Sequence, residues 1–149
     1  FNGLLVRNGD LAPKVEPWRN REEMVFVPTL YDATTAAGLT SAEVDWVAVT
    51  NPKTITWSFP ELPTTDNVIV KELIATGDMT AEQVGWFKTK NPSWRDIIWT
   101  KAACHLVTTR KPNFLMFHLL NTDAVNHSHG PGSFGSFTAY AFADRLLGD

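Results

Sequence analysis

The chain has 149 residues, of which 44% are hydrophobic, 11% aromatic and 19% charged, and its formal net charge is −3. This composition predicts one globular unit with a buried core and argues against a disordered chain. The acidic balance, without a cluster of Lys or Arg, argues against a nucleic-acid polymer as partner, and no apolar run reaches the roughly 20 residues that membrane insertion needs. The single Cys104 excludes an internal disulfide framework and a Cys-rich zinc module.

The first half of the chain predicts a helix followed by a strand. Pro28 stands where the first turn of a helix tolerates proline, and apolar residues continue at helical spacing until Gly38, a typical helix end. Residues 44–49 form the first predicted strand. Three prolines make residues 51–63 too proline-rich for a central strand, so we expect a long loop of the kind that often lines a site.

The second half predicts helices that lead into another strand. Helical patterns occur within residues 68–110, and a capping box of Ser93 and Asp96 is expected to open the last of these helices. An apolar strand at residues 114–120 follows directly. Because a helix leads into a nearly continuous apolar strand twice, the sequence predicts an α/β fold with a mainly parallel sheet and helices on both faces.

A polar stretch that contains an acid and a histidine follows the second strand. Asp123 and His127 are four residues apart, a spacing at which one turn of helix points both side chains the same way. In open α/β sheets, functional groups gather beyond the ends of strands. One carboxylate and one imidazole suit zinc or another divalent metal, although a stable site needs three or four protein ligands. The spacing therefore predicts a metal-binding pair, and the alternative is a solvated Asp beside a hydrogen-bonding His. His129 is offset from His127 by two residues and is expected to lie outside the pair.

Other features have simpler structural explanations. Gly130–Gly135 matches the dinucleotide fingerprint G-x-G-x-x-G, but nine residues separate it from the strand, so a turn with Ser133 capping a last helix is expected instead. His105 and His118 lie in apolar segments and are expected to be buried and remote from Asp123 and His127. Cys104 has no base beside it in the sequence, which argues against a thiol nucleophile.

Residues 111–131, KPNFLMFHLLNTDAVNHSHGP, resemble the segment of type I phosphodiesterases/nucleotide pyrophosphatases that ends in D-x-x-x-H-x-x-G-P. Residues 27–33, VPTLYDA, are similar to a helix of the same family, and residues 44–46 stand where the family places its next strand. The family belongs to the alkaline phosphatase superfamily. The resemblance therefore implies that the chain is part of a three-layer αβα, alkaline phosphatase-like fold.

The resemblance also implies a set of functional residues. Asp123 and His127 would bind one of two divalent metal ions, expected to be zinc, and Asn2 would contact phosphate, with an Asn-Gly turn as its alternative. In the predicted loop, Trp57 and Phe59 are candidates for a wall of the substrate pocket, because aromatic faces stack on a base or an apolar alcohol.

The nucleophilic Thr or Ser of the family and the remaining metal ligands are expected outside this chain. The chain also begins at Phe1 without a signal segment, so we expect residues 1–149 to be one incomplete catalytic domain. An internal segment of a larger sheet leaves strand edges or apolar faces uncovered, and self-association is therefore expected.

The sequence thus favours a segment of a metal-dependent hydrolase that cleaves phosphoric (di)ester or pyrophosphate bonds in a small-molecule phosphate ester or nucleotide. Two alternatives stay open. One is a non-catalytic α/β interaction domain, in which Asp123 and His127 make only hydrogen bonds. The other is a nucleotide-binding oxidoreductase fragment that uses Gly130–Gly135.

Overall fold

The computed structural model describes residues 3–17, 19–47 and 49–148, so the candidate phosphate contact Asn2 lies outside the described residues. The elements, in chain order, are β1 (Gly3–Asn8), β2 (Leu11–Pro17), α1 (Arg21–Met24), α2 (Leu30–Ala36), β3 (Ser41–Val44), β4 (Trp57–Phe59), α3 (Val68–Thr76), α4 (Ala81–Trp86), α5 (Pro92–His105), the π-helical turn η1 (Leu106–Arg110), β5 (Phe114–Phe117), α6 (Asn121–His129) and α7 (Phe134–Gly148).

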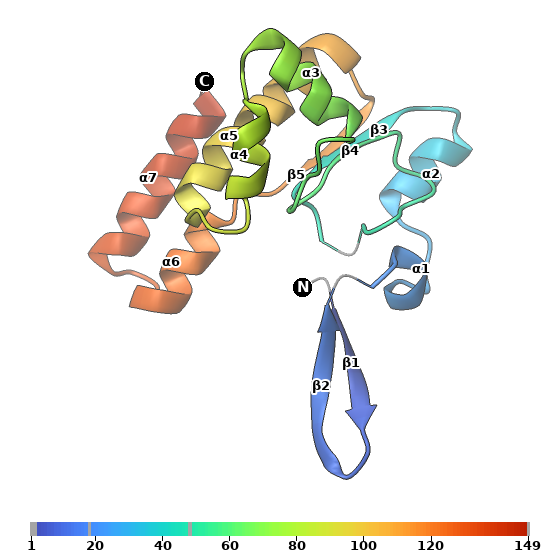
Figure 1. Cartoon of the computed structure of the whole chain (residues 1–149), viewed down its shortest axis with the longest axis vertical. Helices are drawn as coiled ribbons and strands as arrows, with labels where there is room; N and C mark the ends of the chain where they lie inside the picture. The colour runs from blue at the N-terminus through green and yellow to red at the C-terminus, as the bar shows by residue number, and fades with distance from the viewer. Residues whose placement is uncertain (1–2, 18, 48, 149) are drawn as a thin grey trace.

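A small parallel sheet forms the centre of the chain, with strand order β4-β3-β5 (Figure 1). The middle strand β3 pairs in parallel with both neighbours, and Val44 at its end is level with Phe59 of β4 and Phe117 of β5. Parallel strands end on the same side of a sheet. We call the side on which β3, β4 and β5 end the carboxyl edge.

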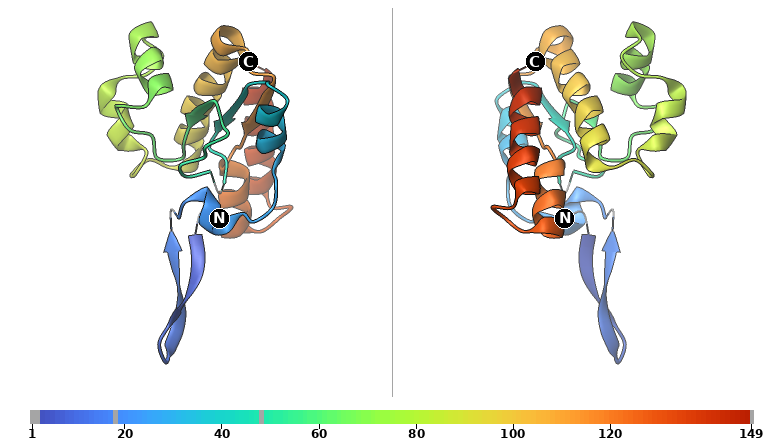
Figure 2. Two further views of the ribbon diagram at one scale, coloured as in Figure 1. Left: turned by 90° about the vertical axis from the view of Figure 1, so that its right-hand side faces the viewer. Right: turned by 90° about the vertical axis from the view of Figure 1, so that its left-hand side faces the viewer.

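Helices flank this sheet, with α2 on one side and α3 to α5 on the other (Figure 2). Both faces of the sheet are covered, as the side chains of β5 show, since successive residues of a strand point to opposite faces. Leu115 and Phe117 pack on the larger core beneath α3 and α5, whereas Phe114 and Met116 pack with Tyr31 of α2. The predicted α/β class with a parallel sheet flanked by helices is therefore confirmed.

The larger core is built around aromatic rings from three elements. Phe59 of β4 meets Phe87 edge-on, with ring centroids 5.9 Å apart, and Phe87 lies 6.0 Å from Trp99 of α5. All three side chains are buried. Full burial of aromatic rings supplies much of the free energy that fixes α5 against the sheet.

The strand boundaries differ from the sequence prediction. Residues 44–49 were predicted as a strand, but β3 ends at Val44 because Asp45 has a φ of 53°, in the left-handed region that a strand cannot contain. Residues 51–63 were predicted to be a loop too proline-rich for a central strand; no central strand lies there, but the prediction of a loop throughout was wrong, since β4 lies within these residues. β4 is an edge strand of only three residues, and Pro60 follows it without breaking a hydrogen bond of the sheet.

Two further parts of the chain complete the fold. The antiparallel hairpin β1–β2 projects away from the helices and exposes Leu5 and Leu11 (Figure 1), and the sequence prediction contained no strand there. At the other end, α7 turns back against α6, and both helices contact α5. Within the part of the chain that is described, no helix combines the length and apolar character required to cross a membrane.

Candidate functional site

The carboxyl edge of the sheet carries an acid–histidine pair from two neighbouring strands. Asp45 follows β3 directly and His118 follows β5 directly. The backbone N–H of Asp45 donates to Phe59 O at 3.0 Å, and that of His118 donates to Val44 O at 3.1 Å. These bonds fix the three strand ends relative to one another, so both side chains start from rigid positions.

The side chains of Asp45 and His118 are bonded to each other, with Oδ2 and Nδ1 2.9 Å apart. Burial raises the pKa of Asp45 to about 6, and the hydrogen bond that the His118 ring donates to this carboxylate raises the pKa of His118 above the ordinary 6.5. The expectation that His118 is buried was wrong, because its side chain is 34% exposed at the carboxyl edge. Strand β5 ends at Phe117, one residue before His118, so the His118 side chain is not packed in the core.

A second buried acid, Glu43, lies in the middle of β3. Its carboxylate accepts a hydrogen bond from the backbone N–H of Trp46 at 2.9 Å and another from the Ser58 hydroxyl. The side chain is fully buried, and this burial raises the pKa of Glu43 from 4.5 to about 7. The sequence analysis did not select this residue, because it lies outside the strand that was predicted at residues 44–49.

The predicted metal pair lies on α6, the helix that begins beyond β5. Asp123 is in the first turn of this helix, and its Oδ1 lies 3.3 Å from Nε2 of His127. Both side chains face solvent, with 58% of Asp123 and 80% of His127 exposed. The predicted convergence of these two side chains is therefore present. One oxygen and one nitrogen at this separation can both reach a single divalent ion after small rotamer changes.

The start of α6 is held by residues of α5. Asp96 accepts hydrogen bonds from the backbone N–H groups of Leu120, at 2.9 Å, and Asn121, at 3.1 Å. The Ser93 hydroxyl donates to Asn121 Oδ1 at 2.9 Å. The predicted capping box of Ser93 and Asp96 was wrong, because the N-cap of α5 is Asn91, whose side chain accepts from Trp94 N. The sequence signal that identifies Asp96 is its place on the buried face of an apolar helix.

The glycines of the dinucleotide-like motif form the turn between α6 and α7. Gly130 ends α6 with a φ of 81°, a conformation that other residues rarely adopt. A Cβ on Gly135 would lie 3.3 Å from Val125 Cγ1, so this glycine allows α7 to approach α6 closely. Ser133 Oγ accepts from Ser136 N at 3.1 Å, which confirms the predicted cap of the last helix. These contacts account for the motif without a nucleotide. His129 is exposed on α6.

The two aromatic residues proposed for a substrate wall have different surroundings. Phe59 is completely buried against Phe87, so its ring has no free face on which a substrate could stack. Trp57 is half-buried, and the guanidinium carbon of Arg110 lies 5.8 Å from the centre of its ring. The loop nevertheless forms a cavity of about 480 Å³ beside the carboxyl edge, and its aromatic lining residue is Trp46. The sequence analysis did not select Trp46.

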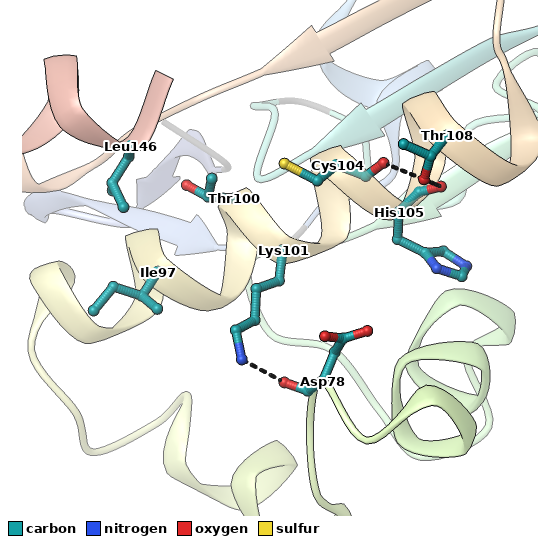
Figure 3. Close-up of a pocket in the computed structure, with 8 residues that line it drawn as sticks. All are labelled: Asp78, Ile97, Thr100, Lys101, Cys104, His105, Thr108 and Leu146. Carbon is teal, nitrogen blue, oxygen red and sulfur yellow. Dashed lines mark hydrogen bonds between the residues drawn. The ribbon is translucent and has the colours of Figure 1, made fainter. Parts of the chain in front are cut away.

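A second cavity, of about 350 Å³, lies on the outer side of α5 and does not include the residues of the carboxyl edge (Figure 3). Lys101 and Cys104 line it, and the Lys101 amine donates to Asp78 O at 3.0 Å. His105 contributes to the rim, and its Nε2 lies 2.7 Å from the Glu72 carboxylate. These contacts hold His105 against Glu72 of α3, with its side chain only 10% exposed.

The metal-binding residues of a complete centre are not all found within the described ranges 3–17, 19–47 and 49–148. No group of three or more His, Cys, Asp or Glu in these ranges could hold an ion together. Asp123 and His127 therefore form at most two of the three or four ligands that a stable transition-metal site needs.

Comparison with known proteins gives one match. The family described as Type I phosphodiesterase / nucleotide pyrophosphatase matches residues 5–149, nearly the whole chain. No curated protein and no solved structure matches the chain.

Proposed function

Because the chain belongs to the type I phosphodiesterase/nucleotide pyrophosphatase family, we propose that it forms part of a catalytic domain that hydrolyses phosphoric (di)ester or pyrophosphate bonds. The substrate class is a small-molecule phosphate ester or nucleotide. The observation that carries the proposal is the 3.3 Å approach of Asp123 Oδ1 and His127 Nε2 beyond the carboxyl edge of a parallel sheet, within the matched residues. The three-layer, alkaline phosphatase-like arrangement is part of the same proposal.

Asp123 and His127 are the residues that would hold one of two divalent ions, with zinc as the expected metal. The donor set fits, because a hard carboxylate oxygen and an imidazole nitrogen are both common ligands of zinc. A bound ion supplies positive charge that stabilises the phosphoryl oxygens and favours an ionised hydroxyl nucleophile. We propose that the Thr or Ser nucleophile and the remaining ligands come from outside these 149 residues.

At the carboxyl edge, the chain's own residues would bind and orient the substrate and transfer protons. Asp45 accepts from His118 Nδ1, which leaves Nε2 of His118 as the ring nitrogen that can exchange a proton with a bound group. The cavity lined by Trp46 is the proposed site for the organic part of the substrate, and the partly exposed Trp57 is a candidate neighbour. Asn2 is retained as a proposed phosphate contact.

A zinc titration followed at the histidine ring nitrogens tests this proposal directly. We expect Nε2 of His127 to shift on addition of zinc, while His105, which is bonded to Glu72, stays unchanged. Asp123→Asn should abolish the response at His127, and the matched control Asp144→Asn on the exposed side of α7 should retain it. A response that survives Asp123→Asn, or a chain that shows none, would contradict the proposed metal pair.

A non-catalytic interaction domain is the second candidate function. The observation that favours it is that the described residues provide only two converging metal ligands. The same titration separates the two functions, because an interaction domain with a simple Asp–His hydrogen bond has no specific response to zinc at His127.

A further inference from the structure

Helix α6 lacks a cap of its own. Its N-cap residue is Leu120, whose side chain cannot accept a hydrogen bond from the first backbone N–H groups. The first N–H groups of every helix need partners from elsewhere, and leaving them unpaired in a buried position costs free energy. In this structure the neighbouring helix α5 supplies those partners.

Asp96 is the principal partner, and it uses both carboxylate oxygens. Oδ1 accepts from Leu120 N at 2.9 Å and Oδ2 accepts from Asn121 N at 3.1 Å. The side chain is completely buried. Burying a carboxylate carries a desolvation penalty that hydrogen bonds and the positive end of a helix dipole offset only in part. Each carboxylate oxygen of Asp96 takes one of the two N–H groups, whereas an Asn in the same orientation would place its NH2 donor against one of them.

The same two bonds fix the direction in which α6 leaves the sheet. Asn121 is its first residue, and a second contact from α5 holds the Asn121 side chain through the Ser93 hydroxyl at 2.9 Å. Each residue of an α-helix rotates by about 100° relative to the previous one. Fixing the first turn on a rigid helix therefore fixes the directions of Asp123, two residues on, and of His127, one turn further.

The face of α6 that carries Asp123 and His127 is exposed to solvent. Asp123 and His127 are mostly solvent-exposed, so core packing does not hold their side chains. Helix α7 contacts α6 at Val125 and His129, and the Asn126 amide donates to the Tyr140 hydroxyl at 3.0 Å. The hydrogen bonds from α5 restrain the first turn of α6, which carries Asp123, whereas the bond to Tyr140 lies further along the helix.

We propose that Asp96 is a positioning residue that holds the first turn of α6 so that Asp123 and His127 converge on one divalent ion. The proposal rests on the proposed function, since the pair it positions is the proposed metal pair. It assigns to α5 a role in metal binding although α5 contributes no ligand. Residues that orient metal ligands from outside the coordination sphere typically change metal affinity by 10–100-fold when they are replaced.

The test compares Asp96→Asn with a control that removes an equivalent helix cap elsewhere. Asn67 accepts from Ile69 N at 2.9 Å and Val70 N at 3.1 Å at the start of α3, so Asn67→Ala also removes a cap of two backbone bonds. Zinc is titrated into the full chain, and binding is followed at the His127 ring nitrogens. We expect Asp96→Asn to weaken zinc binding about tenfold, whereas Asn67→Ala loses stability but keeps its zinc affinity.

Two measurements on the metal-free chain test the positioning role of Asp96 independently of zinc binding. Amide exchange at Leu120 and Asn121 should accelerate in Asp96→Asn, and the nuclear Overhauser contact between the Asp123 and His127 side chains should weaken. If Asp96→Asn folds poorly, Ser93→Ala removes only the weaker contact and should weaken zinc binding about threefold.

The outcomes for the two proposals are distinct. Absence of a zinc response at His127 in the unsubstituted chain overturns the proposed metal pair, and the Asp123–His127 contact in Asp96→Asn then decides the positioning role by itself. Unchanged zinc affinity and an unchanged contact in Asp96→Asn, or an equal loss of affinity in Asn67→Ala, overturns the positioning role while the proposed function stands.

Discussion

Glu43 is expected to make the chain less stable as the pH rises, and Glu43→Gln should remove this effect. The side chain is fully buried, and burial raises its pKa from 4.5 to about 7. A group whose pKa is raised by folding stabilises the folded state below the unfolded pKa and loses that stabilisation as the pH rises through the folded pKa. The relevant range is therefore about pH 4.5 to 7.

The magnitude follows from the two pKa values. Each unit of difference corresponds to about 1.4 kcal/mol, so ionisation of Glu43 disfavours the folded state by about 3 kcal/mol at pH 8 and by about 1 kcal/mol at pH 5. Gln has the same shape and never ionises. Its carbonyl can accept from Trp46 N while its amide donates to the Ser58 hydroxyl, so both present hydrogen bonds have equivalents.

Urea unfolding at pH 5 and pH 8 measures the effect. We expect the free energy of unfolding of Glu43→Gln to exceed that of the unsubstituted chain by about 2 kcal/mol more at pH 8 than at pH 5. Glu82→Gln on the exposed side of α4 is the matched control and should show the same pH dependence as the unsubstituted chain. Parallel pH profiles for Glu43→Gln and the unsubstituted chain would show that Glu43 is not ionised at pH 8 or is not buried.

Three further outcomes are expected. The pKa of the His118 ring should lie above its ordinary value, and Asp45→Asn should lower it in an NMR titration, because the hydrogen bond to the Asp45 carboxylate is the first cause of the raised pKa. An unchanged midpoint would contradict the pair. Phe87→Ala should lower the free energy of unfolding in urea by about 3–5 kcal/mol, since the ring is buried against the rings of Phe59, Trp94 and Trp99. A loss below about 1 kcal/mol would contradict that packing. The purified chain should not hydrolyse bis-p-nitrophenyl phosphate, because only two candidate metal ligands converge in the described residues. Zinc-dependent release of p-nitrophenol that Asp123→Ala abolishes would instead show that the chain holds a complete site.

The sequence predicted those parts of the fold that local patterns determine. The strand after residue 113 and the i, i+4 spacing of Asp123 and His127 were sufficient to place the pair on a helix beyond a strand, as observed. The cap at Ser133 was also predictable, because its partner Ser136 is only three residues away. In each case the interacting residues are close in sequence.

The contacts that the sequence did not predict join residues that are far apart in the chain. The Asp45–His118 bond spans 73 residues, and the bond from Asn121 N to Asp96 spans 25. Local patterns assigned Asp96 to a cap three residues away and His118 to an apolar strand, and both assignments were wrong because tertiary contacts replaced local ones. The strand β4 was missed for the same reason, since its pairing with β3 depends on the sheet rather than on its own composition.

The buried acids of this chain support the carboxyl edge as its functional side. Burial raises the pKa of Glu43, Asp45 and Asp96, and all three lie within the β3 strand, at its end, or against the start of α6. Each acid is paired with a group from a different element, so none of them is required by the local structure of its own helix or strand. A fold that needed only stability could place apolar residues at such positions, often with no loss of stability. Ionisable groups with perturbed pKa values that gather on one side of a sheet are typical of functional sites. This side is also where α6 presents Asp123 and His127, and it lies within the residues that match the phosphodiesterase family.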